Sequence, residues 1–426
     1  MTPAPPPPLP AGLRVAIVGA GVSGLAAAHY LSRRHAVTVF EADGRLGGHA
    51  HTHEVRDGGT VRRLDTGFLV YNRVTYPGFV RLLDELGVAS VPTDMSLSVR
   101  CRACDLEYGV RGARAIFAQK RNLLRPAFFG LFADLRRFFR DGRAFLAAGG
   151  EDGLTLGAFL DRGGYGRELT RHWLLPTAAA LWSASFESVL AYEARFFLAF
   201  FENHGFLRVR QLPWWTVEHG SRTYVDALAR GLAGRVRLSS PVREVRRAGP
   251  EVRVTVEGRP PEPFDAVVLA CHADGARALL ADASPEEDDL LGRFSYARHR
   301  VLLHTDRSFL PRAPAAWSAW NCDLEDCRDA AAPASLTYYL NRLQSVASET
   351  PFCVTLNPRR EPTGILAEMQ YAHPQLTAGA ARAARSLTAL SGRRSTWYAG
   401  AHLGHGFHED GVASALAVAA GLGVTP

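Results

Sequence analysis

The first apolar run of the chain, residues 14–18, is followed by a glycine-rich turn and then by apolar residues at helical spacing. The turn reads Gly19-Ala-Gly21-Val-Ser-Gly24, and a second apolar run at 36–40 ends at Glu41. This order of strand, tight turn, helix and strand predicts a β-α-β unit of about 30 residues.

Later segments alternate between helical and strand patterns. Long apolar and aromatic stretches predict mainly helix over 76–213. Strands are predicted at 234–258 (with a turn at Gly249-Pro250), 264–271, 300–305, 335–339, 352–356 and 396–400, and a small-residue helix at 412–420. The chain would therefore leave a nucleotide-binding domain and return to it twice.

We accordingly predict an α/β fold with a Rossmann-type cofactor domain and a discontinuous α+β substrate domain. The cofactor domain would comprise residues 14–75, 215–275 and 390–426. The substrate domain would comprise 76–214 and 276–389, as an antiparallel sheet with a helical excursion. Residues 1–13 are Pro-rich and predict a disordered tail.

The glycine turn has the spacing that binds a dinucleotide pyrophosphate at a helix N-terminus. The first glycine makes the tight turn, the second admits the phosphate, and the third permits close helix–strand packing. Glu41 follows at the end of the next strand, where an acid hydrogen-bonds ribose hydroxyls. Its charge would repel a ribose phosphate, which disfavours NADP.

Composition narrows the class of partner. The formal net charge is +7, and Lys120 is the only lysine. A basic surface suits an anionic ligand or an anionic membrane, whereas the absence of a nucleic-acid motif or basic tail excludes nucleic acid. With no export signal and no apolar run long enough to span a bilayer, we expect a cytoplasmic protein, with the inner membrane as a candidate peripheral contact.

Neither cysteines nor histidines form a metal motif in the sequence. Cys101 and Cys104 are an isolated C-x-x-C without a second Cys/His pair, so we interpret them as incidental thiols. His49, His51 and His53 alternate but lack a carboxylate at matching spacing. No metal site is predicted.

Arg45-Leu-Gly47-Gly48 after the second strand resembles the amine-oxidase-like, FAD-dependent oxidoreductase superfamily, which shares a glutathione-reductase-like FAD domain. Three further segments carry the resemblance: Asp65-Thr-Gly67-Phe68, Pro241-Val242, and Tyr398-Ala-Gly400 with Gly406-Phe-His-Glu-Asp-Gly411. Together with the glycine turn, this resemblance implies the following FAD contacts: Gly19, Gly21, Ser23, Gly24, Glu41, Ala42, Arg45, Gly47, Gly48, His49, Gly67, Phe68, Val242, Gly400, Glu409, Asp410 and Val412. Helix capping is the alternative role for Glu409 and Asp410. No cysteine lies between Gly400 and Gly411, so FAD is expected to be non-covalent.

Other runs resemble one bacterial group, the FAD-binding proteins associated with cyclopropane-fatty-acid-synthase-type lipid methyltransferases. They are His49-Ala-His51-Thr-His53, Asp65 to Asn72, Thr75-Tyr76-Pro77, Asn341-Arg342-Leu343-Gln344 and Gly406 to Gly411. The resemblance implies oxidation or desaturation of a modified fatty acyl chain, with a lipid methyltransferase as a candidate partner.

The sequence departs from true amine oxidases at one position. Those enzymes usually place a lysine near flavin N5, but the corresponding strand here carries His299-Arg300-Val-Leu-Leu-His304. No second dinucleotide motif for NAD(P)H is present either. An amine or natural-product oxidase, a redox-neutral isomerase and a flavin-bearing accessory protein remain as alternatives.

Histidines are the candidate proton carriers: His51, His53, His402 and His408. His49 is expected at the flavin edge. The alternative for His51 and His53 is a strand with one ring inward and the next at the surface.

Three further features have a structural and a functional interpretation. Phe196, Phe197, Phe200, Phe201, Phe206, Trp214 and Trp215 are either core or the wall of an acyl tunnel. Asn341, Arg342 and Gln344 either line the site or are solvated. The basic, aromatic segment 120–140 either packs on the substrate domain or lies on an anionic membrane.

Overall fold

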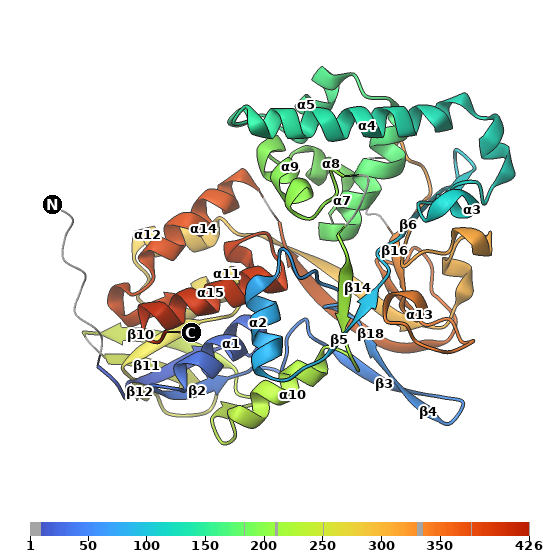
Figure 1. Cartoon of the computed structure of the whole chain (residues 1–426). Coiled ribbons are helices and arrows are strands. Elements are labelled where there is room, and N and C mark those ends of the chain that lie inside the picture. The colour runs from blue at the N-terminus through green and yellow to red at the C-terminus, as the bar shows by residue number, and fades with distance from the viewer. Residues whose placement is uncertain are drawn as a thin grey trace.

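The computed structural model describes residues 10–182, 184–208, 212–249, 251–329, 335–375 and 377–425. A parallel sheet with helices on both faces lies beside a larger mixed sheet, and a group of helices covers the mixed sheet (Figure 1). Pro250 of the expected turn and residues 1–9 of the expected tail lie outside the described residues.

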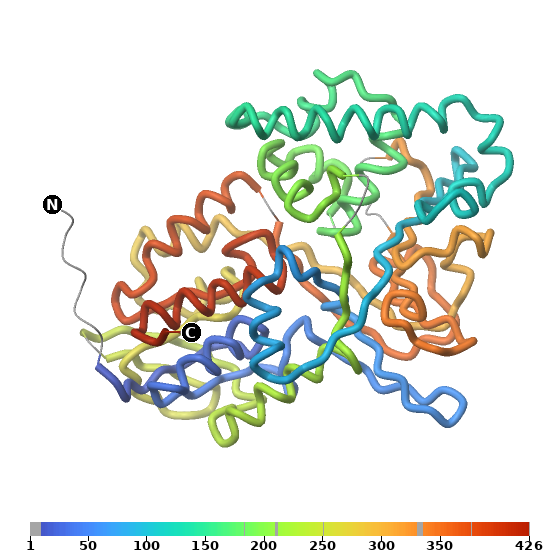
Figure 2. Tube along the Cα trace, in the orientation of Figure 1, coloured from blue at the N-terminus to red at the C-terminus, as the bar shows by residue number. Residues whose placement is uncertain are grey.

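The parallel sheet has five strands in the order β19–β13–β1–β2–β9. They are β1 (Arg14–Val18), β2 (Ala36–Phe40), β9 (Val236–Arg237), β13 (Ala266–Leu269) and β19 (Thr396–Tyr398). Helix α1 (Val22–Leu31) joins β1 to β2 and confirms the predicted β-α-β unit. The chain returns to this sheet from distant parts of the sequence (Figure 2).

Alternate residues of β1 enter two separate cores. Val15 and Ile17 pack with one set of helices, and Ala16 and Val18 pack on the opposite face. Since both faces are covered, the strand is apolar from Val15 to Val18. The first face carries α1, α2 (Pro77–Glu85), α10 (Arg222–Gly231) and α15 (His408–Gly421); the second carries α11 (Ala273–Leu279), α12 (Pro285–Gly292), α14 (Ala378–Leu390) and the antiparallel strands β10 (Val242–Ala248), β11 (Glu251–Val256) and β12 (Glu262–Phe264).

The mixed sheet has the order β18–β14–β17–β16–β15–β6–β7, antiparallel except for the parallel pair β15–β6. Its strands are β6 (Leu97–Cys101), β7 (Leu106–Gly109), β14 (Tyr296–His304), β15 (Trp320–Leu324), β16 (Ser335–Tyr339), β17 (Cys353–Leu356) and β18 (Ile365–Pro374). Two antiparallel pairs, a short helix and two 3₁₀ turns complete this half: β3 (Thr52–Asp57) with β4 (Thr60–Asp65), β5 (Ser90–Thr93) with β8 (Trp214–Val217), α13 (Leu340–Leu343), η3 (Arg307–Phe309) and η4 (Pro314–Ala316). Two further 3₁₀ turns, η5 (Arg393–Ser395) and η6 (Ala401–Leu403), flank β19 on the parallel sheet.

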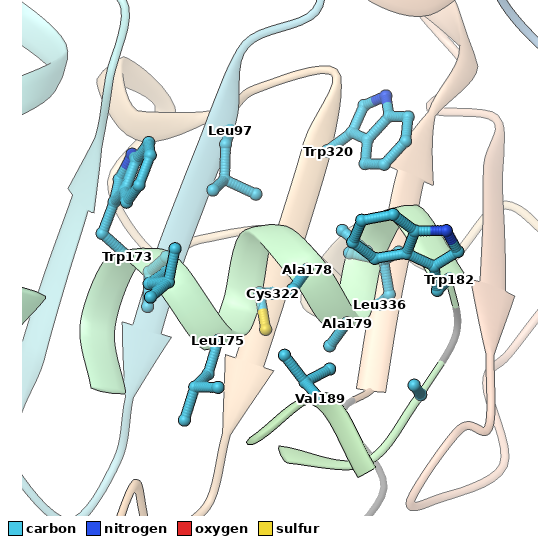
Figure 3. Packing of buried hydrophobic residues seen from close by; sticks show 14 of the residues in the cluster. Leu97, Trp173, Leu175, Ala178, Ala179, Trp182, Val189, Trp320, Cys322 and Leu336 are labelled. Atoms are coloured by element: carbon cyan, nitrogen blue, oxygen red, sulfur yellow. The ribbon is translucent and has the colours of Figure 1, made fainter. Parts of the chain in front are cut away.

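A helical layer packs on the mixed sheet through an aromatic-rich core. Ala178 and Ala179 face Cys322 and Leu336 of the strands, as Figure 3 shows. Both alanines belong to α7, and their small side chains let this helix lie close to the sheet. The layer comprises α3 (Gly112–Ile116), η1 (Lys120–Leu124), α4 (Pro126–Ala147), α5 (Leu156–Gly163), α6 (Arg167–Leu169), the π-helical turn η2 (Thr170–Leu174), α7 (Leu175–Trp182), α8 (Phe186–Leu190) and α9 (Ala194–Asn203).

The structure adds strands that the sequence pattern does not predict. Strands β5, β6 and β7 interrupt the region expected to be mainly helical, and β3, β4, β15 and β18 have no counterpart among the predicted strands. Few residues of the β3–β4 hairpin and β18 are fully buried, so their sequences lack a continuous apolar face that would reveal them.

The cores also cut across the predicted domain boundaries. Helix α2, expected in the substrate domain, packs with α15 against the parallel sheet. Helices α12 and α14, also expected there, pack on the opposite face of that sheet. Among the described residues, no helix is both long and apolar enough to cross a membrane.

Candidate active site

The glycine turn after β1 has the geometry that its three glycines predict. Gly19 has φ +103°, and a Cβ there would lie 2.7 Å from the Ala270 carbonyl oxygen. A Cβ on Gly24 would lie 1.9 Å from the Gly19 carbonyl oxygen, whereas one on Gly21 would meet no atom within 4 Å. Helix α1 begins beside this open space, and its N-cap residue Gly21 makes no side-chain cap hydrogen bond. The helix N-terminus is thus free to bind an anion.

Glu41 lies against this turn from the end of β2. Its Oε2 accepts a hydrogen bond from the Ala20 N–H at 2.8 Å, and Oε1 accepts one from the Asp43 N–H at 2.9 Å. The Ser240 N–H donates to the Glu41 carbonyl at 2.8 Å, which brings the start of β10 at Val242 to the same edge. The acid therefore lies where an adenosine ribose would follow a pyrophosphate on the turn.

The Gly47-Gly48 pair runs directly beside the glycine turn. Gly47 forms a parallel bridge with Gly21, and a Cβ on Gly48 would lie 3.2 Å from the Gly21 Cα. Side chains at these positions would push the two segments apart. Arg45 lies half-buried just before the pair, and Ala42 is exposed.

Gly67 and Phe68 cross over His49. A Cβ on Gly67 would lie 2.1 Å from the His49 carbonyl oxygen, which accepts a hydrogen bond from the Phe68 N–H at 2.8 Å. The aromatic ring of Phe68 stacks on His408 with a centroid separation of 3.5 Å. The two predicted flavin-side segments are therefore in direct contact.

The closing segment returns to the start of α1. A Cβ on Gly411 would lie 2.8 Å from Ser23 Oγ, so α15 and α1 approach closely at their N-termini. The Gly400 N–H donates to Ser414 Oγ at 2.9 Å, and Val412 is fully buried. The glycine turn, the Gly-Gly pair and the closing helix thus meet in one place.

Two acids expected to face the flavin act as helix caps instead. Glu409 accepts hydrogen bonds from the N–H groups of Gly78 and Phe79, both at 2.9 Å, at the start of α2. Asp410 accepts one from the Phe407 N–H at 2.9 Å at the start of α15. The capping role is confirmed for both, because these carboxylates satisfy orphan helix donors.

His408, expected as a proton carrier, is a core residue. Its Nε2 lies 3.0 Å from Tyr224 Oη, and its ring lies between Phe68 and Phe79. Burial holds its pKa well below the usual value. The ring is therefore neutral and its Nε2 is engaged, which corrects the catalytic expectation for this residue.

His51 and His53 share one face of the chain. Their ring centroids are 4.1 Å apart, and His51 Nδ1 lies 3.0 Å from Tyr371 Oη. Burial, with Arg45 and His53 nearby, lowers the pKa of His51 to about 3. The expectation that one ring points inward and the next outward is wrong, because residues two apart in extended chain lie on the same side. Thr52 between them points to Asp65.

A group of histidines gathers beside the Gly-Gly pair. His373 lies 5.2 Å from His49 and 5.2 Å from His299, between ring centroids. His272 lies 6.4 Å from His49. Among the described residues, His49 Nε2, His299 Nε2 and His373 Nδ1 are buried without a hydrogen-bond partner. These three nitrogens are available to a bound group.

Burial keeps the rings of this group neutral. It lowers the pKa of His49 to about 4, and it lowers the pKa values of His299 and His373 as well. His402, in η6, packs edge-on against Phe294, and burial lowers its pKa to about 3. No signal in the sequence placed His272 or His373 in this group. His373 lies near the end of β18, a strand whose sequence has no clear apolar pattern.

Asp65 is a buried structural hub. Its carboxylate accepts hydrogen bonds from Thr52, from the backbone and side chain of Ser221, and from Gln344 Nε2 at 2.8 Å. Asn341 binds the backbone of Ser348, Thr350 and Phe352. Gln344 and Asn341 thus position loops, so the expectation that they are simply solvated is wrong.

A cavity of about 940 Å³ lies between the mixed sheet and the helical layer. Phe206 and Trp214 line it, as the tunnel hypothesis predicts, whereas Phe197 and Phe201 are fully buried in the core. Its apolar lining includes Met95, Val110, Ile116, Leu131, Phe132, Leu135, Phe139, Trp173 and Leu212, and its charged lining comprises Asp94, Arg111, Arg136, Arg208 and Arg342.

The residues fit FAD. The open space at Gly21 and the uncapped start of α1 suit a pyrophosphate, and Glu41 lies next along the same edge. The unpartnered nitrogens of the histidine group lie on the Gly-Gly side, where polar edges of a flavin ring would find hydrogen-bond partners. When bound, FAD would supply hydride acceptance. Its non-covalent attachment stays a prediction.

Gly21→Asp is expected to abolish FAD retention. The protein has space for the side chain, but its charge would oppose the pyrophosphate. The measurement is the flavin-to-protein absorbance ratio after purification. Gly231→Asp, at an equally open glycine in α10, is the matched control and should stay yellow. A yellow Gly21→Asp protein would contradict the assignment.

Glu409→Ala is expected to lower the free energy of unfolding by about 1–2 kcal/mol, as loss of a helix cap does, while leaving the flavin content unchanged. Denaturant unfolding and absorbance measure the two effects. Glu251→Ala, at an exposed position, serves as the control. Loss of flavin with an unchanged unfolding midpoint would restore the cofactor role of Glu409.

The histidine group predicts acid instability. The unfolded chain takes up protons near pH 6.5, whereas folded His49 does so only near its pKa of about 4. The free energy of unfolding should therefore fall as the pH drops from about 6.5 towards 4, by up to about 1.4 kcal/mol per pH unit for each such ring.

His373→Gln should reduce the slope of the free energy of unfolding against pH, measured by denaturant titrations between about pH 6.5 and 4. His219→Asn, at an exposed histidine with positive φ, should leave it unchanged. Equal slopes in wild type and His373→Gln would show that the group is not held neutral.

Solved structures share this fold over almost the whole chain. A fatty acid isomerase from P. acnes superposes with a TM-score of 0.65 at 15% identity, over 95% of this chain and 97% of that one. Putrescine oxidase bound to putrescine gives 0.69 at 15%, over 97% and 99%. Cyclohexylamine oxidase from Brevibacterium oxydans gives 0.68 at 15%, over 96% and 98%.

Curated relatives match only short stretches of sequence. Protoporphyrinogen oxidase 2, chloroplastic/mitochondrial, of Arabidopsis thaliana is 76% identical over 38 residues, and the flavin-dependent L-tryptophan oxidase RebO of Lentzea aerocolonigenes is 46% identical over 55. These stretches are 9% and 13% of this chain, and 8% and 12% of the relatives. The family model for flavin containing amine oxidoreductase matches residues 22–313. The chain belongs to this family and is an FAD-dependent oxidoreductase.

Proposed function

We propose that this flavoprotein oxidises or desaturates an acyl chain, or a similar apolar substrate, by hydride transfer to flavin N5. The observation that carries the proposal is the cavity of about 940 Å³, whose wall is mainly apolar and aromatic. Apolar pockets of this size bind large, hydrophobic ligands.

The charged groups of the cavity suit an anionic head group. Asp94 forms an ion pair with Arg111 and a second one, at 3.1 Å, with Arg342. Arg208 forms an ion pair with Glu202. Arg136, on α4, adds another guanidinium. Arginines outnumber acids in the lining, so a carboxylate or phosphate at the end of an acyl chain would be attracted to this side.

Aromatic rings connect the cavity wall to the closing segment of the cofactor site. Phe206 lies 6.2 Å from Trp214, which stacks at 6.3 Å on His204. His204 lies 5.9 Å from Phe407, one residue before α15. A chain held along these rings would be shielded from water, as hydride transfer requires.

The groups available for proton transfer favour a C–H substrate over an amine. Lys120 is exposed in η1, away from the flavin-side strands. Strand β14, which resembles the strand that carries the lysine in amine oxidases, carries His299, and this ring lies beside His373. In this proposal His49, His299 and His373 replace His408 as candidate acceptors for the proton lost next to the hydride.

Peripheral membrane contact would give access to a lipid substrate. Leu123, Leu124 and Phe129 are 53%, 85% and 46% exposed, and they lie among Lys120, Arg121 and Arg125. Apolar residues flanked by cations suit an anionic bilayer surface. A cytoplasmic location and a lipid methyltransferase partner belong to the same proposal.

Two alternatives have their own support. The likeness to putrescine and cyclohexylamine oxidases favours an amine substrate, and the likeness to a fatty acid isomerase favours a redox-neutral reaction. An accessory protein would bind its partner without reduction of the flavin by any lipid.

Anaerobic flavin bleaching separates these functions. The purified protein is mixed with cyclopropanated, methylated or unsaturated fatty acids and phospholipids, and in parallel with amines. Bleaching by an acyl compound is the expected result. Bleaching by amines alone would overturn the substrate proposal. Conversion of a lipid without bleaching would identify an isomerase, and no reaction at all would favour the accessory role.

Ile116→Trp is expected to lower kcat/KM for the acyl substrate at least tenfold, because the larger ring fills the cavity. Flavin absorbance should not change. Leu366→Trp, at an exposed position on β18, is the control and should retain full activity. Wild-type kcat/KM in Ile116→Trp would show that the substrate lies elsewhere.

A further inference from the structure

Three cysteines and one histidine meet at the edge of the mixed sheet. Cys101 ends β6, Cys104 lies in the turn to β7, and Cys327 follows β15. His172 comes from the π-helical turn η2. One candidate ligand atom from each of the four lies within 4.8 Å of all the others. The expectation that Cys101 and Cys104 are isolated thiols is therefore wrong.

The backbone holds the cysteines in place. The N–H groups of Arg102 and Ala103 donate to the carbonyls of Leu324 and Glu325, both at 2.9 Å, and so fix the C-x-x-C turn against the segment leading to Cys327. Asp105 closes the turn with φ +46°. The four residues thus lie on three elements that the fold brings together.

The sulfur spacing suits a shared metal ion. Cys104 Sγ and Cys327 Sγ are 3.5 Å apart. A disulfide requires about 2.05 Å, whereas Zn–S bonds of about 2.3 Å in a tetrahedron separate two sulfurs by about 3.8 Å. Small side-chain movements would close the group around one ion.

His172 is oriented as a metal ligand. Its Nδ1 lies 2.5 Å from Glu168 Oε2, and its Nε2 is buried without a hydrogen-bond partner among the described residues. A carboxylate on one ring nitrogen orients the other towards a metal in many zinc sites. Tyr108 Oη also donates to the His172 carbonyl at 2.7 Å and holds this turn on β7.

We propose that Cys101, Cys104, His172 and Cys327 bind a structural zinc ion. Four protein ligands complete a tetrahedral shell and leave no open position, as in structural rather than catalytic zinc sites. A cavity of about 470 Å³ reaches Cys104 and His172 and offers a path of entry; Arg167 and Arg328 in its lining offset the negative charge of three thiolates.

The ion would join the edge of the sheet to the helical layer. Trp173, next to His172, lines the large cavity, so the ion would also hold one wall of the candidate substrate site. The zinc proposal does not depend on the identity of the substrate.

The first test is elemental analysis of the purified, flavin-loaded protein. We expect one zinc per chain. Cobalt exchange should produce tetrahedral d–d bands at wavelengths beyond flavin absorption. A chain without metal, or a Cys104–Cys327 disulfide found by peptide mass spectrometry, would overturn the proposal.

Variants locate the site. Cys104→Ser and Cys327→Ser should lose stoichiometric zinc, and Glu168→Gln should weaken zinc binding about 10- to 100-fold while keeping all four ligands. Cys353→Ala, which removes a buried thiol from β17, is the matched control and should retain the ion. Full zinc content in Cys104→Ser and Cys327→Ser would refute these ligands. If Cys104→Ser or Cys327→Ser does not fold, the cobalt spectrum of the wild type and the zinc affinity of Glu168→Gln still decide whether these residues bind zinc.

Discussion

The close approach of two helix N-termini organises the cofactor side of the molecule. Gly411 at the start of α15 packs on Ser23 at the start of α1, and a single Cβ there would meet both Val22 and Ser23 at 2.8 Å. Because α15 also supplies the Glu409 cap for α2, this one contact sets the positions of three helices on the same face.

The sequence predicted the parts of the fold that carry strong local signals. Strands β1 and β2 have their predicted limits, since both are apolar runs bounded by turn residues. The β3–β4 hairpin and β18 were missed because few of their residues are fully buried, so no apolar pattern marks them. Glycine roles at the turn were predictable from backbone sterics. The partners of Glu409, Asp410 and His408 were not, since each contact depends on how distant elements pack.

The candidate zinc site also could not be predicted from the sequence, because its ligands come from distant segments. Spacing rules detect ligands that come in pairs, and here the second pair is split between Cys327 and His172, 155 residues apart in the chain. Only the pairing of β6 with β15 and the placement of η2 bring them together. The neutral histidine group could not be predicted for the same reason, because His49 and His373 meet only through the position of β18.

The strand order of the parallel sheet has a consequence for biosynthesis. One outer strand, β19, pairs with β13, and β13 pairs with β1, so the sheet is complete only after residue 398 has left the ribosome. At about 5–20 residues per second, the N-terminal glycine turn waits tens of seconds for its partners. During synthesis this turn therefore stays exposed until α15 has been made, because Gly411 of α15 packs on Ser23 beside the turn.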